Sequence, residues 1–511
     1  MLPEVREVRL DNGFLALLVE RHNLPVVAST MWYRVGARDE QTGESGLSHF
    51  IEHMMFKGTV RYRKGEIDLL TSKMGGSNNA FTDHDNTCYY FSLPAERWET
   101  ALDIEASRMR GCLFEPSEFE AEKSVVLEEL AMGQDDPWSR LFQKTESIAY
   151  ERHPYHRPII GWREELEMLS VDRMRDYYRR HYGVNRAFMV IVGSFDADRT
   201  EAKLRQLFGD KPRAGSRPPV IAEPDLDGER RAVIHAPGDI ARVAFACHTC
   251  RIGEHDDFVF DVIAQIFGQS KSSRLHRRMT IDEPLASQVG VHNDVRFDPG
   301  LFWVYSELVP GVLAARGEAA MRDEMRRLVD EGVTDEEVER ALTQIRSSFL
   351  FEDESVMGTA LKFGRFEAST ARGYRLAGDV EAIYSRITPN TVRETMARYF
   401  AGDGWTVVWS LPESVRDQHR FASRVDPRKL TSDATRPKIA RAKKPAAKRK
   451  SKSAKSPKSV EGRTKKGVKK SEAKQRKGEQ KAAKKERETR ETRQRKEVHP
   501  SVVRLDRRRK S

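Results

Sequence analysis

Residues 46–59, GLSHFIEHMMFKGT, combine an apolar stripe at helical spacing with three titratable side chains. Large apolar residues at i, i+3, i+4, i+7 and i+8 predict a helix that buries one face. Those residues are Leu47, Phe50, Ile51, Met54 and Met55. His49, Glu52 and His53 share a second face of the same helix, because they lie three and four positions apart. They are either ordinary surface polar groups or one side of a metal site.

The spacing of two histidines around a glutamate suits zinc chemistry. Two imidazoles one helical turn apart can bind the same ion, and a neighbouring carboxylate can take a proton from a water on it. The pattern H-x-x-E-H arises by chance in about 3% of chains of this length, so by itself it is only suggestive. A third ligand elsewhere in the chain would make the metal hypothesis specific.

Residues 115–133, EPSEFEAEKSVVLEELAMG, offer that third ligand on a second predicted helix. The apolar stripe of this helix includes Val125 and Val126, and it also takes in Glu122 and Glu129. A carboxylate on a buried face is costly unless it pairs with a cation or binds a metal. The sequence therefore predicts that the helix with two inward glutamates packs against the helix with two inward histidines.

Several segments of the chain together resemble peptidase family M16, the zinc metallopeptidases with the inverted motif H-x-x-E-H that are called inverzincins. The resemblance is to the short, mitochondrial-processing-peptidase-like branch and extends from Arg6 to about Pro412. The segments are GLSHFIEHMMFKGT (46–59), GGSNNAFTDHDNTCYY (75–90), EKSVVLEEL (122–130), HPYHRPIIGWREEL (153–166), SSRL (272–275) and GLFWVYSEL (300–308).

This resemblance implies a metalloendopeptidase with one zinc ion per chain. His49, His53 and Glu129 are the implied zinc ligands. Glu52 is the implied general base, and Glu122 is the implied catalytic-site carboxylate behind the ligands. These assignments coincide with the two inward-facing pairs that the helical stripes predict.

The implied substrate is a peptide or an unfolded protein segment, held as an added β-strand in a chamber. SNNAFTDHDNTCYYFSLP, residues 77–94, alternates polar and apolar side chains as a half-buried strand with an available edge does. Asn79, Ala80 and Phe81 are expected to bind the substrate strand. The alternative is that Asn79 merely makes a turn after the preceding pair of glycines.

The whole chain predicts an α+β fold with two tandem domains and a basic tail. The resemblance implies two mitochondrial-processing-peptidase-like (LuxS/metallopeptidase-like) α/β sandwich domains, each an antiparallel-rich sheet packed with helices. We expect an N-terminal domain with the zinc site at 1–210, a linker rich in Pro and Gly at 211–232, and a second domain without metal at 233–425. TMWYRVGARDE and FACHTCRIGEHDD echo each other weakly, which hints at a distant duplication.

The net charge of +11 divides unevenly along the chain. Residues 431–511 contain 32 Lys and Arg against 9 Asp and Glu, so they carry +23 and leave −12 for the rest. Because this segment has few apolar residues, we expect it to be disordered. It is either a solubilising tail or a weak binder of nucleic acid or another anionic surface.

The second half departs from the family pattern. Related enzymes carry an Arg and, seven residues later, a Tyr that help to hold the substrate carbonyl; the corresponding residues here are Thr280 and Ser287. We therefore expect a heterodimer in which a homologous chain supplies the Arg and Tyr pair. The alternative is a homodimer that uses Arg274, Arg277 or Arg278 instead.

Other interpretations of the chain are a non-catalytic structural subunit of a peptidase M16 complex and a protein that acts chiefly on nucleic acid through its tail. The N-terminus lacks the pattern of a signal peptide and no apolar run is long enough to span a membrane, so we expect a cytoplasmic protein without a membrane partner.

Overall fold

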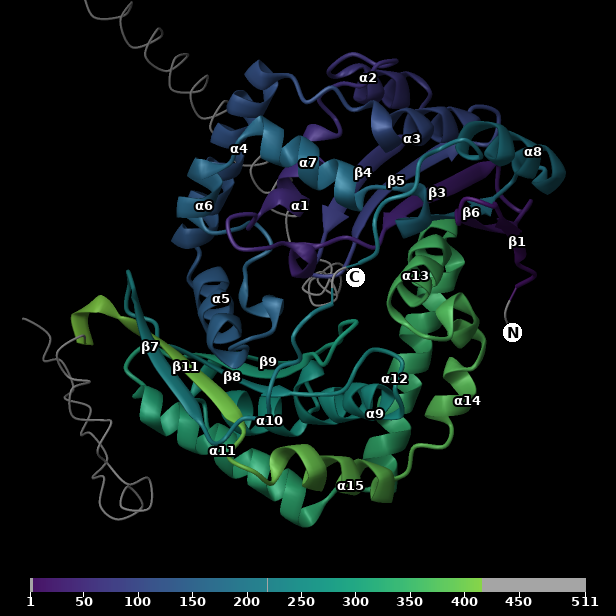
Figure 1. The fold of residues 1–511 in the computed structure, drawn as a ribbon. Helices are drawn as coiled ribbons and strands as arrows, with labels where there is room; N and C mark the ends of the chain where they lie inside the picture. Colours follow the sequence, from purple (N-terminus) through teal and green to yellow (C-terminus); the bar gives the residue numbers. More distant parts are fainter. Residues whose placement is uncertain (1–2, 218, 416–511) are drawn as a thin grey trace, which may run out of the picture. The chain divides into compact units, whose positions relative to one another are not determined.

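A computed structural model describes residues 3–217 and 219–415 of the chain. These residues form two β-sheets, each layered with helices (Figure 1). The predicted α+β class, with two antiparallel-rich sheets packed against helices, is confirmed. The predicted tail at 431–511 and its expected disorder lie outside the described residues.

The first sheet has the strand order β1-β2-β6-β3-β5-β4. Strands β2 and β6 are parallel and all other neighbours are antiparallel, which leaves β4 at an edge. Its strands are β1 (Arg6–Arg9), β2 (Leu15–Glu20), β3 (Val26–Tyr33), β4 (Ser77–Thr82), β5 (Thr87–Pro94) and β6 (Ala187–Gly193). The helices of this half are α1 (Leu47–Met54), α2 (Glu66–Lys73), α3 (Glu99–Gly111), α4 (Pro116–Asp135), α5 (Pro137–Ala149), α6 (Arg163–Met168), α7 (Val171–His181) and α8 (Ala197–Phe208).

The second sheet has the order β7-β11-β8-β10-β9, with β7 and β11 parallel. Its strands are β7 (Arg230–Ala236), β8 (Arg242–His248), β9 (Ala286–Asp294), β10 (Leu301–Leu308) and β11 (Trp405–Pro412). The helices are α9 (His255–Ala264), α10 (Arg274–His276), α11 (Ala314–Glu331), α12 (Asp335–Glu354), α13 (Val356–Ser369), α14 (Val380–Tyr384) and α15 (Pro389–Phe400). The 3₁₀ helices are η1 (Ala37–Asp39), η2 (Pro154–His156), η3 (Val184–Arg186), η6 (Gly373–Gly378) and η7 (Glu413–Val415), and the π-helices are η4 (Gln265–Gln269) and η5 (Arg277–Asp282).

The two halves repeat one topology. Strands β2, β6, β3, β5 and β4 of the first sheet lie in the same order and the same directions as β7, β11, β8, β10 and β9 of the second. Helix α1 follows β3 as α9 follows β8, and α3, α4 and α5 follow β5 as α11, α12 and α13 follow β10. This correspondence supports the distant duplication that the sequence echo hinted at.

One helix of each half packs against the sheet of the other half. Helix α13 packs on β3 and β6 of the first sheet, where Ala360 and Phe363 join a core with Trp32 and Val190. Helix α5 packs on β8 and β11 of the second sheet through Leu141 and its neighbours. Figure 1 shows both helices beside the sheets that they cover.

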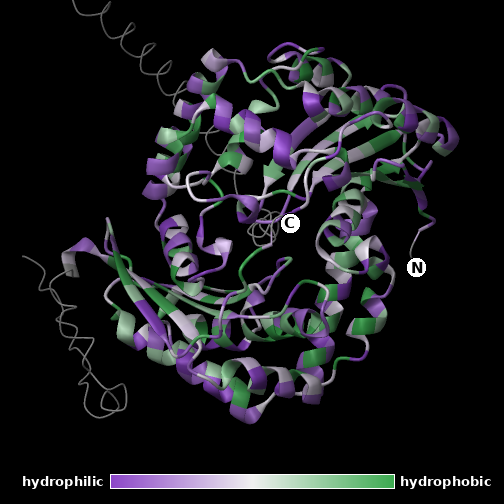
Figure 2. Cartoon of the chain, viewed as in Figure 1, coloured by the Kyte–Doolittle hydropathy of each residue, from purple (hydrophilic) through white to green (hydrophobic). Residues whose placement is uncertain are grey.

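This exchange explains why some strands are apolar without alternation. All seven residues of β6, AFMVIVG, and all eight of β11, WTVVWSLP, are buried. The sequence of a strand that is covered on both faces is a continuous hydrophobic run. Figure 2 shows the central strands as the hydrophobic part of the fold, with hydrophilic residues concentrated on the outer helices.

A polar contact also joins the halves. Asp298, in the loop between β9 and β10, accepts a hydrogen bond from His153 at 3.0 Å and pairs with Arg38. The backbone N–H of Phe297 donates to Asp85, which also accepts from the Tyr155 hydroxyl. The domain bounds at 1–210, 211–232 and 233–425 stay predictions, because these contacts and the exchanged helices cross them.

The helix exchange can be tested with two helical glycines. A Cβ at Gly364 of α13 would lie 2.1 Å from the indole nitrogen of Trp32, whereas a Cβ at Gly133 of α4 would meet nothing within 4 Å. We expect Gly364→Ala to destabilise the protein by about 1–3 kcal/mol through overpacking. Gly133→Ala should stabilise it by up to about 1 kcal/mol, because alanine favours the helix.

Urea unfolding measures both variants, and limited proteolysis reports whether the halves stay packed. A Gly364→Ala protein that is as stable as Gly133→Ala would contradict the packing of α13 on the first sheet.

Candidate metal centre

The buried carboxylate of Glu40 stabilises the N-terminus of α1. Glu40 accepts hydrogen bonds at 2.8 Å from the backbone N–H groups of Gly46 and Ser48, so it satisfies two donors at the helix start. Burial raises the pKa of Glu40 to about 8, although both backbone N–H groups oppose that shift. No local pattern in the sequence links Glu40 to a helix that starts seven residues later.

The buried face of α1 sets its distance from α4. All five residues of the predicted apolar stripe are buried, as expected. The Phe50 ring stacks on Phe119 of α4, with 4.9 Å between ring centroids. On α4 the buried stripe contains Phe119, Glu122, Val126 and Leu130, whereas Val125 is 44% exposed. The prediction that the two helices pack face to face is confirmed.

This packing brings together the histidines of α1 and one glutamate of α4. The Nε2 atoms of His49 and His53 each lie 3.7 Å from a different oxygen of Glu129. One ligand atom from each of the three residues lies within 4.8 Å of the others, and no other such group of His, Cys, Asp and Glu occurs among residues 3–217 and 219–415. The imidazoles are neighbours, with 4.6 Å between ring centroids.

The geometry and the chemistry of these three side chains fit a zinc ion. Ligand atoms bonded to one tetrahedral zinc at about 2.0–2.1 Å are about 3.4 Å apart, close to the separations here. The distance of 3.7 Å is too long for a hydrogen bond between Glu129 and either ring. His49 Nδ1 is buried without a hydrogen-bond partner, and burial lowers the pKa of His49 well below its usual value. A neutral imidazole is the form that binds zinc.

Glu122 lies behind His53. Its Oε1 is 3.0 Å from His53 Nδ1, and its Oε2 is 2.5 Å from Nζ of Lys57. Burial disfavours the Glu122 carboxylate, but the hydrogen bonds from His53 and Lys57 outweigh it and hold its pKa below the usual value. Burial likewise opposes the protonated His53 ring, and its hydrogen bond to Glu122 raises the pKa of His53. With Nδ1 engaged by Glu122, Nε2 of His53 faces Glu129 and the metal position.

Glu52 lies beside the same cluster. Thr82 of β4 donates a hydrogen bond of 2.6 Å to its Oε2. Burial raises the pKa of Glu52 to about 7, although the Thr82 hydrogen bond and the nearby His53 oppose that shift. No sequence pattern marks Thr82 as a partner of Glu52, although this residue ends the strand that was expected to bind substrate.

The three residues expected to bind substrate lie on the edge strand β4. Phe81 packs edge-on against Trp32 at 5.5 Å, and Asn79 lies opposite Tyr90 of β5 in the strand pairing. Ala80 lies on the opposite face of the strand and packs against the core that contains α1. The predicted strand is therefore present and has an open edge, while the role of Asn79, Ala80 and Phe81 stays a prediction.

In the second half, the residues at the Arg and Tyr positions bond within their own domain. Thr280 donates to the carbonyl of His276, and Ser287 bonds Glu307. Two of the alternative arginines are occupied: Arg274 makes a bidentate pair with Glu337, and Arg278 pairs with acids of α11. The third, Arg277, is 70% exposed and lies 3.4 Å from Asp282.

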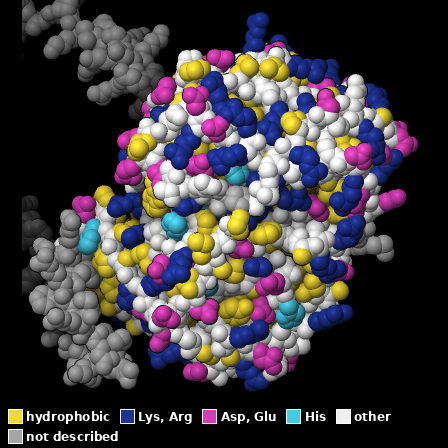
Figure 3. Space-filling view, in the orientation of Figure 1, with side chains coloured by type: hydrophobic (Ala, Val, Ile, Leu, Met, Phe, Trp, Pro, Cys, Tyr) yellow, Lys and Arg dark blue, Asp and Glu magenta, His cyan; other side chains and the backbone are white. Residues whose placement is uncertain are grey.

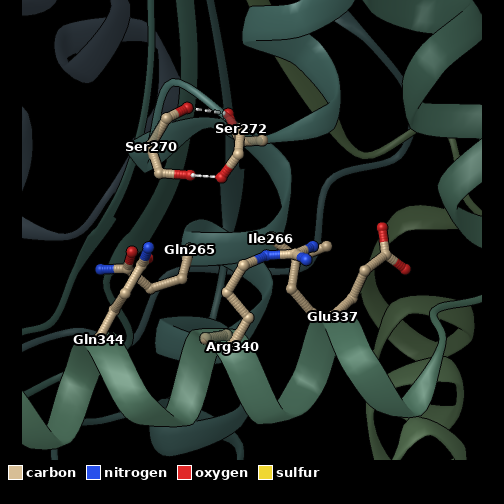
Figure 4. A pocket seen from close by; sticks show the side chains of 9 residues that line it. Gln265, Ile266, Ser270, Ser272, Glu337, Arg340 and Gln344 are labelled. Atoms are coloured by element: carbon tan, nitrogen blue, oxygen red, sulfur yellow. Dashed lines mark hydrogen bonds between the residues drawn. The ribbon is translucent and has the colours of Figure 1, made fainter.

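A small polar hollow lies beside this region, between η4 and α12. In Figure 4, Arg340 and Gln344 of α12 and Gln265 of η4 surround it, with Ser270 and Ser272 hydrogen-bonded to each other above. Its volume of about 10 Å³ suits about one water molecule, which is too small for a peptide side chain. The hollow therefore offers no second substrate site.

Three further histidines, His84, His153 and His156, are not part of the metal cluster. His84 contacts the carbonyl of Arg157, and His153 and His156 bond within the contact between the halves or within their own turn. No helix among the described residues is both long and apolar enough to cross a bilayer.

The chain is similar in sequence and in fold to known peptidases. The family described as "Insulinase (Peptidase family M16)" matches residues 15–162, and "Peptidase M16 inactive domain" matches residues 169–345. An "Uncharacterized zinc protease" of Rickettsia bellii is 27% identical over 401 residues, which cover 78% of this chain and 96% of the relative. "Zinc protease PqqE" of Helicobacter pylori is 26% identical over 371 residues, which cover 71% and 84%.

Among solved structures, a protease from Helicobacter pylori matches with a TM-score of 0.78 at 24% sequence identity, covering 81% of this chain and 100% of that chain. This likeness shows the same fold of two tandem domains. The two family matches cover nearly all of the first half and part of the second half of the described structure, up to residue 345, and the relatives carry the name zinc protease. The chain belongs to peptidase family M16.

Proposed function

We propose that the protein is a zinc-dependent endopeptidase that hydrolyses peptides or unfolded protein segments. The observation that carries the proposal is the convergence of His49, His53 and Glu129 from two helices, with the Glu52 carboxyl beside them. We assign one zinc ion per chain to the first three residues. When bound, zinc acidifies a water molecule and polarises a peptide carbonyl.

Glu52 is the residue that moves protons in this proposal. As a carboxylate it accepts a proton from the attacking water, and it then donates that proton to the leaving amine. Thr82 holds one carboxyl oxygen of Glu52 through a hydrogen bond, which leaves the other oxygen to take and return the proton. Glu122 has no contact with substrate in this scheme; it orients His53.

We place the substrate along β4 as an added strand. The open edge of β4 offers unpaired backbone groups, and Thr82 at the end of the strand bonds the proposed base. Asn79, Ala80 and Phe81 would then bind an extended peptide mainly through their backbone, which favours segments that are unfolded.

A second chain is proposed to complete the site. Thr280 and Ser287 cannot supply a guanidinium or a phenol, and Arg274 and Arg278 are held by acids. These contacts favour a heterodimer with a homologous chain that supplies the Arg and Tyr pair. A homodimer that relies on Arg277 is the alternative.

Two other functions have less support. A non-catalytic structural subunit does not require two histidines and two carboxylates around the proposed metal position, and this chain has all four. Binding of nucleic acid would depend on the tail, and the face in Figure 3 shows basic and acidic side chains interspersed over the described residues rather than a basic patch.

Replacing the proposed base tests the reaction. Glu52→Gln keeps the size of the side chain and a partner for Thr82, but it cannot accept a proton. We expect zinc content equal to that of the wild type and a loss of turnover of at least about a hundredfold. The measurements are metal analysis after dialysis and cleavage of an unfolded protein by the chain, purified with any subunit that accompanies it. Undiminished cleavage by the Glu52→Gln protein would refute the role of Glu52.

The third ligand has a matched control in its neighbour on α4. Glu129→Gln removes a charged ligand, so we expect zinc binding to weaken by at least about tenfold. Glu128→Gln changes an exposed glutamate next to it and should leave zinc binding as it is. Titration with a competing chelator measures both. Equal zinc affinity in the two variants would show that Glu129 is not a ligand.

The need for a partner has its own test. We expect the chain purified alone to bind zinc but to cleave peptides slowly, because the second half lacks donors for the substrate carbonyl. Addition of a homologous chain that has the Arg and Tyr pair should raise the rate. Full peptidase activity of the chain alone would rule out the heterodimer.

A further inference from the structure

Lys57 contacts the carboxylate behind the zinc position, and the proposed reaction gives it no role. It lies in the turn after α1, where its backbone N–H donates to the carbonyl of Met54 at 3.0 Å. Its Nζ lies 2.5 Å from Oε2 of Glu122, on the neighbouring helix α4. The Lys57 side chain is 25% exposed, whereas the Glu122 side chain is only 9% exposed.

Each oxygen of the Glu122 carboxylate contacts a different partner, His53 or Lys57. Oε1 of Glu122 bonds His53 Nδ1 at 3.0 Å, and Oε2 bonds Lys57. A carboxylate bonded on both oxygens has one orientation, so the ring it contacts also has one orientation. Without Lys57, Oε2 would lose its partner in a buried place, and the carboxylate could turn away from the ring.

We propose that Lys57 is a positioning residue of the zinc site, which holds Glu122 so that Glu122 fixes the His53 ring toward the metal. The proposal rests on the zinc assignment of the proposed function. It predicts that loss of Lys57 weakens zinc binding although Lys57 is not itself a ligand.

The chain contains a matched control for this contact. Lys64, in the same connection after α1, lies 2.5 Å from Oε2 of Glu118, one turn before Glu122 on α4. Both pairs tie that connection to α4, but it is Glu122, and not Glu118, that bonds a ligand histidine. A purely structural role of Lys57 would therefore be shared by Lys64.

The experiment measures the zinc dissociation constant of the full chain by competition with a chelator of known affinity, without an assay of peptidase activity. Lys57→Met should weaken zinc binding about 10- to 100-fold, the range expected when the partner of a ligand is lost. Lys57→Arg retains the charge and should recover most of the affinity. Lys64→Met should bind zinc as the wild type does.

Thermal unfolding of the metal-free proteins checks that each variant folds. If Lys57→Met does not fold, Lys57→Gln replaces it, and it should bind zinc more weakly than Lys57→Arg. Wild-type affinity in the folded Lys57→Met or Lys57→Gln protein overturns the proposal, and so does an equal loss in Lys64→Met.

A further variant separates this proposal from the proposed function. His53→Ala should lose zinc binding if the metal assignment is correct. A wild type that binds no zinc, or binds it as tightly without His53, refutes the proposed function and the role of Lys57 together. Zinc binding that depends on His53 but not on Lys57 refutes the role of Lys57 alone.

Discussion

The packing of α1 against α4 is the contact on which the proposed metal site depends. Phe50 and Phe119 stack within the core, and burial of each aromatic side chain contributes about 2 kcal/mol. The same contact places the polar faces of the two helices edge to edge, so His49 and His53 meet Glu129. Apolar burial thus offsets the cost of assembling several titratable groups in a half-buried position.

The duplicated topology lets the proposed metal site in the first half be compared with the corresponding helices of the second half, among the described residues. Helix α9 occupies in the second half the place of α1 in the first, but its single histidine, His255, lies at its first position. Helix α12 corresponds to α4 and uses its glutamates differently, since Glu337 caps its own helix and pairs with Arg274. The second half has the same topology, and its helix α13 packs on the first sheet, which contains β4 and lies beside the proposed zinc position.

Much of the fold could be predicted from local patterns. The apolar run AFMVIVGSF (187–195) is typical of a buried strand and contains β6. Thr334 and Glu337 have the spacing of a capping box, and they form one at the start of α12. Val125 was expected on the buried stripe of α4 but is exposed, because Val126 one position later takes the inner face. The roles of Glu40, Lys57 and Thr82 had no local signal, since each acts on a residue of another element.

The sequence by itself determined the parts of the proposed metal site that lie on one helix. Helical periodicity places His49, Glu52 and His53 on one face wherever that helix packs, and it marks Glu122 and Glu129 as inward on the other. Only the tertiary structure decided which carboxylate oxygens reach which imidazole, and which sheet α5 and α13 cover. The physical reason is that periodicity states that a face is buried, whereas packing between distant segments decides what covers it.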